Sequence, residues 1–303
     1  MSGRAPSPTA IAWIEGRWGS PAELGVPLQD RGLLLADGLF ETVLVRAGRP
    51  VLLEAHLQRW RESAALLGMA TPPEAAELNP LIHEAIERAG LVPNSGHCGA
   101  LRLNWSRGNG GGRGIDLPAA GAHGDHSHRF WLQLSPSTPA FTAQTAHISR
   151  HEQRNGSSRL SRCKTFAYGQ AIQARREALE SGADEALLLS TRGDLCCGTV
   201  ANLLVRGNGR WLTPPLSSGC LPGVMRARAL ALELAEEAEL RWDGERLQAK
   251  PPAAEISDGG GLMIEGPWLL LNSLGCRPIS SINHRRLPQM SEAEAERFWQ
   301  QLL

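Results

Sequence analysis

Five short motifs follow Lys164, and their order restricts the possible folds of this chain more than any other feature. They are Gly182-Ala-Asp-Glu185, Gly193, Cys197-Gly-Thr-Val-Ala-Asn202, Thr213-Pro-Pro-Leu216 and Leu221-Pro-Gly-Val-Met-Arg226. Glycine-bearing turns between apolar runs predict hairpin-connected strands. A glycine at the start of a helix lets free backbone N–H groups bind an anion. An amine, paired strands and an anion loop are the parts needed to hold a phosphorylated aldehyde.

The first half of the chain predicts strands mixed with helices. At 303 residues, the chain is long enough for one large or two medium domains. Apolar residues recur every three or four positions from Leu53 to Leu67, which predicts a helix that stops at Gly68, and a second helix is predicted over 74–89. Strands are predicted at 10–14, 40–45, 50–53, 100–105, 130–134 and 145–149. We therefore expect an α+β domain over residues 1–150.

The second half predicts a core rich in strands with helices around it. Polar residues predict a linker at 151–160, which leaves a second domain over 161–303. Helices are predicted at 167–180, stopping at Gly182, and over a long stretch at 224–240. Strands are predicted at 185–189, 195–197, 202–205, 210–212 and 268–271.

Charge and cysteine usage limit the class of partner. Lys plus Arg and Asp plus Glu both number 31, so the net charge is zero and gives no footprint for nucleic acid or an anionic membrane. No window approaches 18 uninterrupted apolar residues. The six cysteines include no Cys-x-x-Cys pair, which favours reduced thiols in a cytoplasmic protein. We expect a small-molecule partner.

A histidine-rich stretch lies within residues 107–129. His123-Gly-Asp-His126-Ser-His128 contains three imidazoles that could bind a metal. Metal binding needs ligands in a fixed geometry, which a glycine-rich loop does not supply. We therefore predict a loop over 121–129 and no metal site.

Across residues 30–278 the chain resembles the fold-type IV pyridoxal-phosphate enzymes. This group contains branched-chain aminotransferases, D-amino-acid aminotransferases and aminodeoxychorismate lyases. Asp30-Arg-Gly with Asp37-Gly-Leu-Phe-Glu41 resembles the first family motif, and His56-Leu-Gln-Arg59 resembles the second. The resemblance implies a smaller N-terminal α/β domain, a larger C-terminal strand-rich pseudo-barrel domain with helices, bound pyridoxal 5′-phosphate and a homodimer.

The resemblance also assigns residues to the cofactor. It makes Lys164 the Schiff-base lysine, whose amine must be deprotonated to attack an aldehyde. Arg59 matches the arginine that binds the phosphate, a task that suits the paired donors of a guanidinium. Tyr168 follows Lys164 by four residues, so on a helix it would share the same face and either reach the cofactor phenolate or pack in the core. The remaining cofactor positions are Cys197, Asn202, Gly223, Val224, Met225, Asn272 and Ser273.

Cys197 departs from the family pattern. The family usually has a glutamate five residues before the motif asparagine, here Asn202, and its carboxylate keeps the pyridine nitrogen protonated. A neutral thiol is no counterion, so the ring should be a poorer electron sink. Either the reaction relies less on that sink, or Asp194 or Glu185 replaces the acid, or catalysis is lost while the cofactor still binds.

Three further matches favour the lyases within the family. Trp105-Ser-Arg107-Gly108 followed by Arg113-Gly114, then Gly223-Val-Met-Arg226, then Asn272-Ser-Leu274 all resemble lyase segments. Substrate carboxylates would suit Arg107 or Arg113, although Arg107 could instead brace a loop against a backbone carbonyl. Glu41 either orients the substrate or pairs with Arg31 or Arg46.

The resemblance therefore implies a 4-amino-4-deoxychorismate lyase, which releases pyruvate and forms 4-aminobenzoate for folate biosynthesis. The first alternative is an aminotransferase of the same fold acting on branched-chain or D-amino acids. The second is a catalytically impaired cofactor-binding relative, because Cys197 replaces the usual glutamate.

Overall fold

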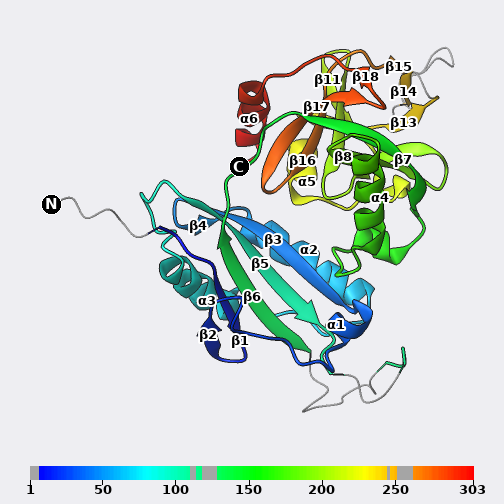
Figure 1. Ribbon diagram of the computed structural model, residues 1–303. Coiled ribbons are helices and arrows are strands. Elements are labelled where there is room, and N and C mark those ends of the chain that lie inside the picture. The colour runs from blue at the N-terminus through cyan, green and yellow to red at the C-terminus, as the bar shows by residue number, and fades with distance from the viewer. Residues whose placement is uncertain (1–6, 110–113, 118–127, 244–245, 251–261) are drawn as a thin grey trace. The chain divides into compact units, whose positions relative to one another are not determined.

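The computed structural model describes residues 7–109, 114–117, 128–243, 246–250 and 262–303. The chain forms two compact units, the first comprising Met1–Thr138 and Cys163–Ala167, the second Pro139–Arg162 and Tyr168–Leu303 (Figure 1). The short segment Cys163–Ala167 thus belongs to the first unit although both of its flanks belong to the second. None of the helices in the described ranges is long and apolar enough to cross a membrane.

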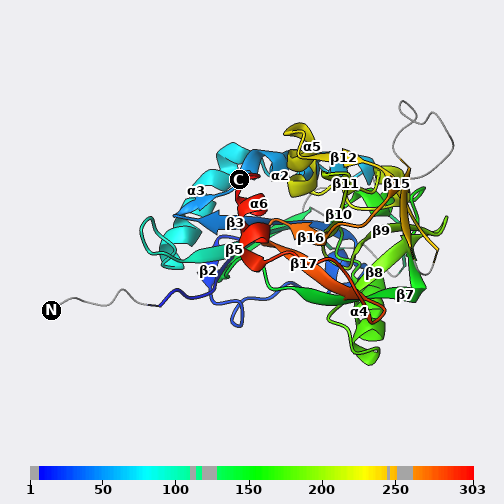
Figure 2. The same cartoon turned by 90° about the horizontal axis from the view of Figure 1, so that it is seen from above.

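The first unit is a six-stranded antiparallel sheet with helices on one face. The strand order is β2-β1-β6-β5-β3-β4. The strands are β1 (Ile11–Ile14), β2 (Arg17–Gly19), β3 (Gly38–Arg46), β4 (Arg49–Pro50), β5 (Cys98–Ser106) and β6 (Arg129–Pro136). The helices are α1 (Arg31–Leu35), α2 (Leu53–Leu66) and α3 (Ala75–Arg88), and α2 and α3 lie along the same side of the sheet (Figure 2).

Apolar and polar residues alternate along the strands, and this alternation explains why helices cover one face of the sheet. Leu101 and Leu103 of β5 and Leu132 and Leu134 of β6 are fully buried and form one apolar core with Leu57 and Trp60 of α2 and Leu78 of α3. Residues two apart on a strand face the same side, so these leucines make a continuous surface for the helices. The polar side chains of Arg102 and Asn104 alternate with the β5 leucines and therefore lie on the other face.

The second unit is a strand-rich, barrel-like sheet. Its strands are β7 (Gln144–Arg154), β8 (Glu185–Ser190), β9 (Asp194–Gly198), β10 (Asn202–Gly207), β11 (Arg210–Thr213), β12 (Ala235–Glu237), β13 (Glu239–Trp242), β14 (Leu247–Lys250), β15 (Leu262–Met263), β16 (Trp268–Asn272), β17 (Gly275–Ile282) and β18 (Arg285–Arg286). The order β10-β16-β17-β7-β8-β9 closes on itself because β9 pairs with β10 at Cys197 and Asn202. The expected pseudo-barrel is confirmed, and its core contains Leu187, Leu203 and Leu270.

Helices surround this sheet. They are α4 (Gly169–Glu180), α5 (Val224–Ala231) and α6 (Glu292–Gln300), with single 3₁₀ turns η1 (Arg159–Arg162) and η2 (Leu216–Ser218). The stretch expected to be a linker at 151–160 includes the end of β7, which continues to Arg154.

The long helix expected over residues 224–240 is wrong. Helix α5 stops at Ala231, and Glu233 adopts a left-handed conformation with φ of 56°. The chain then forms β12, which pairs in parallel with β11, and β13, whose Leu240 is fully buried. Pairing in the sheet and burial in its core outweigh the local helical pattern, which could not place these side chains in that core.

The strand expected at 50–53 is also shorter than predicted. Strand β4 ends at Pro50, and Leu52, with φ of 53°, turns the chain into α2 at Leu53. Helix α2 itself agrees with the predicted helix to within one residue, and α3 agrees as closely with the helix predicted over 74–89.

Candidate active site

Lys164 lies in extended backbone beside β3. Its carbonyl accepts a hydrogen bond from Phe40 N–H (2.9 Å), and Phe166 N–H donates to Gly38 O (3.0 Å). Thr165 makes the intervening bridge with Leu39. Strand pairing therefore fixes the lysine within the first unit, although Lys164 is far in sequence from β3, the strand it pairs with.

This placement corrects the expected relation between Lys164 and Tyr168. Helix α4 begins only at Gly169, and Tyr168 is its N-cap, whose carbonyl accepts from Ile172 N–H at 2.9 Å. Since Lys164 is extended rather than helical, a spacing of four residues does not place the two side chains on one helix face. Pairing of Thr165 with β3 is the physical reason, because it draws this segment out of any helix.

Two cationic side chains lie over the ring of Phe40. Lys164 Nζ is 4.3 Å from the ring centroid, and the guanidinium carbon of Arg102 is 3.5 Å from it. Arg102 Nε also donates to Asn104 Oδ1 at 2.7 Å. Cross-strand register explains the arrangement, because Phe40 pairs with Asn104 and Thr42 with Arg102, which places these residues on one face.

Sequence reasoning did not identify Arg102. A usable signal was present, since the polar residues 102 and 104 alternate with the leucines 101 and 103. In a strand covered on one face by helices, such residues must face away from the core. The pairing of β5 with β3, which brings Arg102 to Phe40 and Lys164, is not local and could not be inferred from that alternation.

Glu41 is buried with Arg59 and His56 of α2. Arg59 donates from Nε to Oε1 (2.8 Å) and from Nη2 to Oε2 (2.5 Å), while His56 Nδ1 lies 2.7 Å from Oε2. Burial by itself would raise the pKa of Glu41, but the charge of Arg59 and the hydrogen bonds from His56 and Arg59 lower that pKa to about 2. Glu41 therefore pairs with Arg59 and His56, not with Arg31 or Arg46, and stays ionised.

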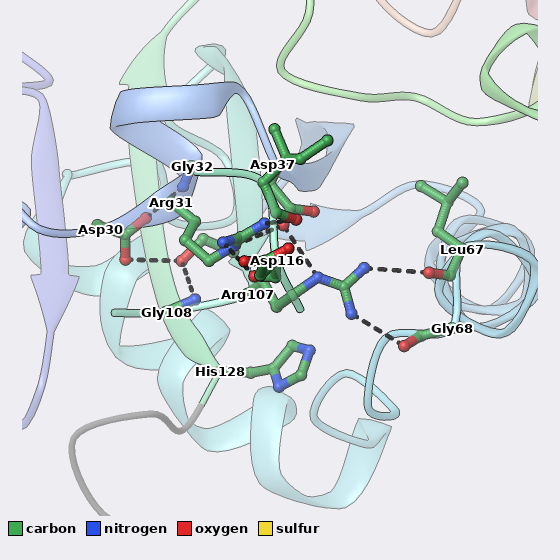
Figure 3. A network of polar contacts seen from close by, with 12 residues as sticks. Asp30, Arg31, Gly32, Asp37, Leu67, Gly68, Arg107, Gly108, Asp116 and His128 are labelled. Carbon is green, nitrogen blue, oxygen red and sulfur yellow. Dashed lines mark hydrogen bonds and ion pairs between the residues drawn. The ribbon is translucent and has the colours of Figure 1, made fainter. Parts of the chain in front are cut away.

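Arg107 belongs to a second polar network in the same unit (Figure 3). Its Nε donates to Asp37 Oδ2 (3.0 Å), Nη1 to Gly68 O (2.9 Å) and Nη2 to Leu67 O (3.0 Å). The guanidinium thus joins the chain just before β3 to the carbonyl end of α2, where a cation is favoured by the helix dipole. Of the two roles expected for Arg107, this geometry matches bracing against backbone carbonyls.

Arg31 extends this network to the segment after Arg107. It donates from Nε to Asp37 Oδ2 (2.9 Å) and from Nη1 to Asp116 O (3.0 Å). Arg113 and most of the predicted loop 121–129 lie outside the described residues. His128 is described: its ring stacks on Trp105 with centroids 5.2 Å apart, and its Nε2 accepts from Ala70 N–H at 3.1 Å.

In the second unit, Asn202 and Gly223 are packed together. Asn202 Nδ2 donates to Leu221 O (2.9 Å), and a Cβ added to Gly223 would stand 1.9 Å from Asn202 Oδ1. A side chain at 223, the N-cap of α5, would therefore require Asn202 to move. The N–H groups of Val224 and Met225 open this helix and have no acceptor among the described residues, as expected for a first helical turn.

Cys197 lies on β9 opposite Asn202 and is buried among thiols. Cys196 and Cys220 belong to the same apolar cluster. The carboxylate of Glu185, one of the two acids considered as a replacement, accepts from Arg175 Nε (3.0 Å) and Thr199 Oγ1 (2.6 Å). Glu185 is thus fully engaged within its own unit.

The last two expected cofactor positions, Asn272 and Ser273, lie at the end of β16 and in the turn after it. Asn272 Nδ2 donates to Val200 O at 3.3 Å, and its Oδ1 accepts from Leu274 N–H at 2.8 Å. These bonds fix the turn that contains Ser273 against the loop between β9 and β10.

Comparison with known proteins identifies the family. The sequence profile of the family "Amino-transferase class IV" matches residues 38–282. The chain belongs to the class IV aminotransferases. It is similar over 291 residues, at 27% identity, to a "Bifunctional aminodeoxychorismate lyase / D-amino acid transaminase" of Mycobacterium tuberculosis, covering 89% of this chain and 91% of the relative. The D-alanine aminotransferase of Bacillus licheniformis is 26% identical over 239 residues, covering 76% of each chain.

Solved structures confirm the fold. A hypothetical aminotransferase from Mycobacterium tuberculosis in its PLP-bound form has a TM-score of 0.74 at 24% identity, covering 96% of this chain and 97% of that chain. A fold IV transaminase from Curtobacterium pusillum has a TM-score of 0.75 at 22% identity, covering 96% and 97%. This class IV chain is accordingly a pyridoxal-phosphate-dependent enzyme, either a lyase or an aminotransferase.

The residues present fit pyridoxal phosphate. Binding of this cofactor calls for an amine, a cation and backbone donors, and the chain offers the Lys164 amine, the buried Arg59 guanidinium and the N–H groups at the start of α5. The fit rests on the chemistry of each group within its own unit.

Proposed function

We propose that this enzyme is a 4-amino-4-deoxychorismate lyase, which eliminates pyruvate and forms 4-aminobenzoate, a precursor in folate biosynthesis. The three lyase-like segments carry this choice, and a relative of similar length is named as both an aminodeoxychorismate lyase and a D-amino acid transaminase. The substrate contains carboxylates, and Arg102 provides a guanidinium over the same ring as the Lys164 amine. A cation at that place suits a carboxylate near the carbon on which the lysine acts.

In this proposal Lys164 Nζ carries the cofactor and then moves protons. Lys164 Nζ would hold the cofactor by its aldehyde and would be left free to act on protons once the substrate amine is in place. It then takes the proton from the amine-bearing carbon and returns a proton to the departing enolpyruvyl carbon. When bound, pyridoxal phosphate supplies an electron sink that stabilises the negative charge left by proton removal.

We carry over Arg59, and the α5 start at Gly223, Val224 and Met225, as phosphate positions; the N–H groups available at that start are those of Val224 and Met225, because Gly223 N–H donates to Leu221 O. The ring would be held by Cys197, Asn202, Asn272 and Ser273, with Tyr168 as a further candidate. We assign the substrate carboxylate to Arg102. Arg113 remains a second candidate, and Arg107 and Glu41 are engaged by other protein groups.

Elimination that ends in an aromatic ring offers a reason why Cys197 can replace an acid. Formation of the aromatic product drives the reaction, so the enzyme needs less stabilisation from the pyridine than a transaminase does. A Cys197→Glu variant should therefore change the absorbance spectrum of the bound cofactor. An unchanged spectrum and rate would contradict this role for position 197.

The test is incubation of the purified enzyme with aminodeoxychorismate. We expect 4-aminobenzoate and pyruvate to form in equal amounts without any added keto acid. The fluorescence of 4-aminobenzoate measures its formation. Conversion of the cofactor to its amine form by D-alanine or a branched-chain amino acid, with no aminobenzoate, would instead identify a transaminase. Cofactor binding with neither reaction would identify the impaired relative.

We also propose a cytoplasmic homodimer. Exposed apolar side chains gather on and beside α1, where Arg31 holds the backbone of Ile115 and Asp116. They are Leu28, Leu33, Leu34, Leu35, Ile115 and Leu117. Such a patch is unusual on a monomer surface, so light scattering should give twice the mass of the chain, and Leu34→Asp should weaken association. The six free thiols suit a reducing compartment.

A further inference from the structure

Glu41 is an ionised carboxylate enclosed by protein. It is 1% exposed, and its strand neighbours Leu39 and Val43 belong to the core that packs against α2. Both oxygens are used, Oε1 by Arg59 and Oε2 by Arg59 and His56. A carboxylate so enclosed does not present an oxygen to a substrate.

The donors come from successive turns of one helix. His56 and Arg59 are three residues apart on α2, so their side chains lie on the same face. An ionised carboxylate only accepts hydrogen bonds, which requires His56 Nδ1 to carry the proton. The Glu41 carboxylate is thereby held from two directions.

We propose that Glu41 and His56 are positioning residues that fix the Arg59 guanidinium for the cofactor phosphate. The inference rests on the phosphate-binding role proposed for Arg59. Glu41 occupies the Nε–Nη2 edge of the guanidinium, so this edge is held toward β3. His56 fixes the oxygen that Arg59 Nη2 contacts, and so acts on Arg59 through Glu41.

An arginine needs such a support. Its side chain has many rotamers, and binding a phosphate with two donors requires one of them. The bidentate pair with Glu41 removes this freedom before the cofactor arrives, which reduces the ordering cost of binding. Leu57 and Trp60, both buried on α2, hold the helix against the sheet that carries Glu41.

Charge alone would act in the opposite direction. Glu41 is negative and repels a phosphate dianion, so replacing it by a neutral residue would strengthen phosphate binding if only charge mattered. A loss of phosphate affinity in Glu41→Gln therefore reports positioning. His56→Leu removes the second donor and leaves the Glu41 charge in place, and His56→Asn restores a donor close to the position of Nδ1.

The experiment measures binding of two aldehydes to the apo form of the full chain. Pyridoxal phosphate and 5′-deoxypyridoxal share the aldehyde and ring, but only the first has a phosphate. The dissociation constant of 5′-deoxypyridoxal divided by that of pyridoxal phosphate therefore isolates the phosphate contribution, and a loss of phosphate affinity lowers this ratio. The variants are Glu41→Gln, His56→Leu, His56→Asn and Arg59→Gln. Glu54→Gln is the matched control, because Glu54 is an exposed carboxylate on α2 that pairs with Arg61.

We expect the ratio to fall roughly tenfold in Glu41→Gln and His56→Leu, the effect of loosening one charge-assisted contact. It should return toward the wild-type value in His56→Asn and stay unchanged in Glu54→Gln. A purely structural role would weaken both aldehydes equally and leave the ratio constant. Should Glu41→Gln fail to fold, the two His56 variants still decide.

Two negative results are distinguishable. If Arg59→Gln lowers the ratio but Glu41→Gln and His56→Leu do not, or if Glu41→Gln raises it, the positioning role is wrong while the phosphate role of Arg59 stands. If Arg59→Gln itself leaves the ratio unchanged, the phosphate assignment made above is wrong.

Discussion

Replacing Arg107 by methionine separates a bracing role from a substrate-binding role. Arg107 is 8% exposed and donates to Asp37 and to the two carbonyls at the end of α2. Methionine has a similar length and can pack in the same space, so the substitution removes mainly the hydrogen bonds. We expect Arg107→Met to lower stability and to leave substrate affinity nearly unchanged.

The size of the effect follows from the three contacts. Hydrogen bonds that involve a charged group contribute about 1.5–3 kcal/mol each. Asp37 keeps its bond with Arg31, and water can reach the carbonyl of exposed Gly68, so the lower end applies to the carbonyls. Two such bonds give about 3 kcal/mol, which, for an unfolding entropy of about 2.1 cal/mol/K per residue over 303 residues, corresponds to roughly 5 °C in Tm.

The assay is a thermal melt alongside steady-state kinetics of the same preparation. Arg102→Met is the matched comparison, because Arg102 donates to Asn104 and lies over Phe40 near Lys164. We expect that variant to raise KM at least tenfold with little change in Tm. The reasoning fails if Arg107→Met keeps its Tm and raises KM, because the guanidinium would then bind substrate.

Three more predictions test the electrostatics and packing. Glu41 has a pKa of about 2 in the folded protein against 4.5 in the unfolded chain, so its ionised form contributes folding stability on the order of 3 kcal/mol. This contribution is complete above pH 4.5 and is lost as the pH falls toward 2. In urea unfolding between pH 6 and pH 3, the stabilities of wild type and Glu41→Gln should therefore converge as the pH falls. Burial and the charge of Arg107 lower the pKa of His128, so the stability that this residue contributes is present above the ordinary histidine pKa and is lost as the pH falls below it. In thermal melts, Tm should therefore fall less between pH 7 and pH 5 in His128→Phe than in wild type. Gly223→Ala forces a methyl group onto Asn202 Oδ1 and should weaken pyridoxal phosphate binding at least tenfold, and an unchanged affinity would show that the α5 start is not a phosphate site.

The sequence could predict features that depend on neighbours along the chain. Alternating leucines predict β5 and β6, and the three-to-four spacing from Leu53 predicts α2 to within one residue. The end of α5 could not be predicted in this way, because pairing of β12 with β11 decides it. The roles of Arg102 and Arg107 also depend on tertiary contacts, since one meets Phe40 across the sheet and the other meets the end of α2.

Strand β3 carries residues that contact both Lys164 and Arg59. Phe40 and Glu41 are consecutive on β3, so their side chains point to opposite faces of the sheet. Phe40 meets Arg102 and Lys164 on one face, and Glu41 meets Arg59 under α2 on the other. The pairing of Leu39 with Thr165 and of Glu41 with Leu103 fixes this division, since a shift of one residue would exchange the two faces. The register of β3 therefore sets which face of the sheet carries the Lys164 amine, proposed to hold the cofactor, and which face carries the Glu41 carboxylate, proposed to position Arg59.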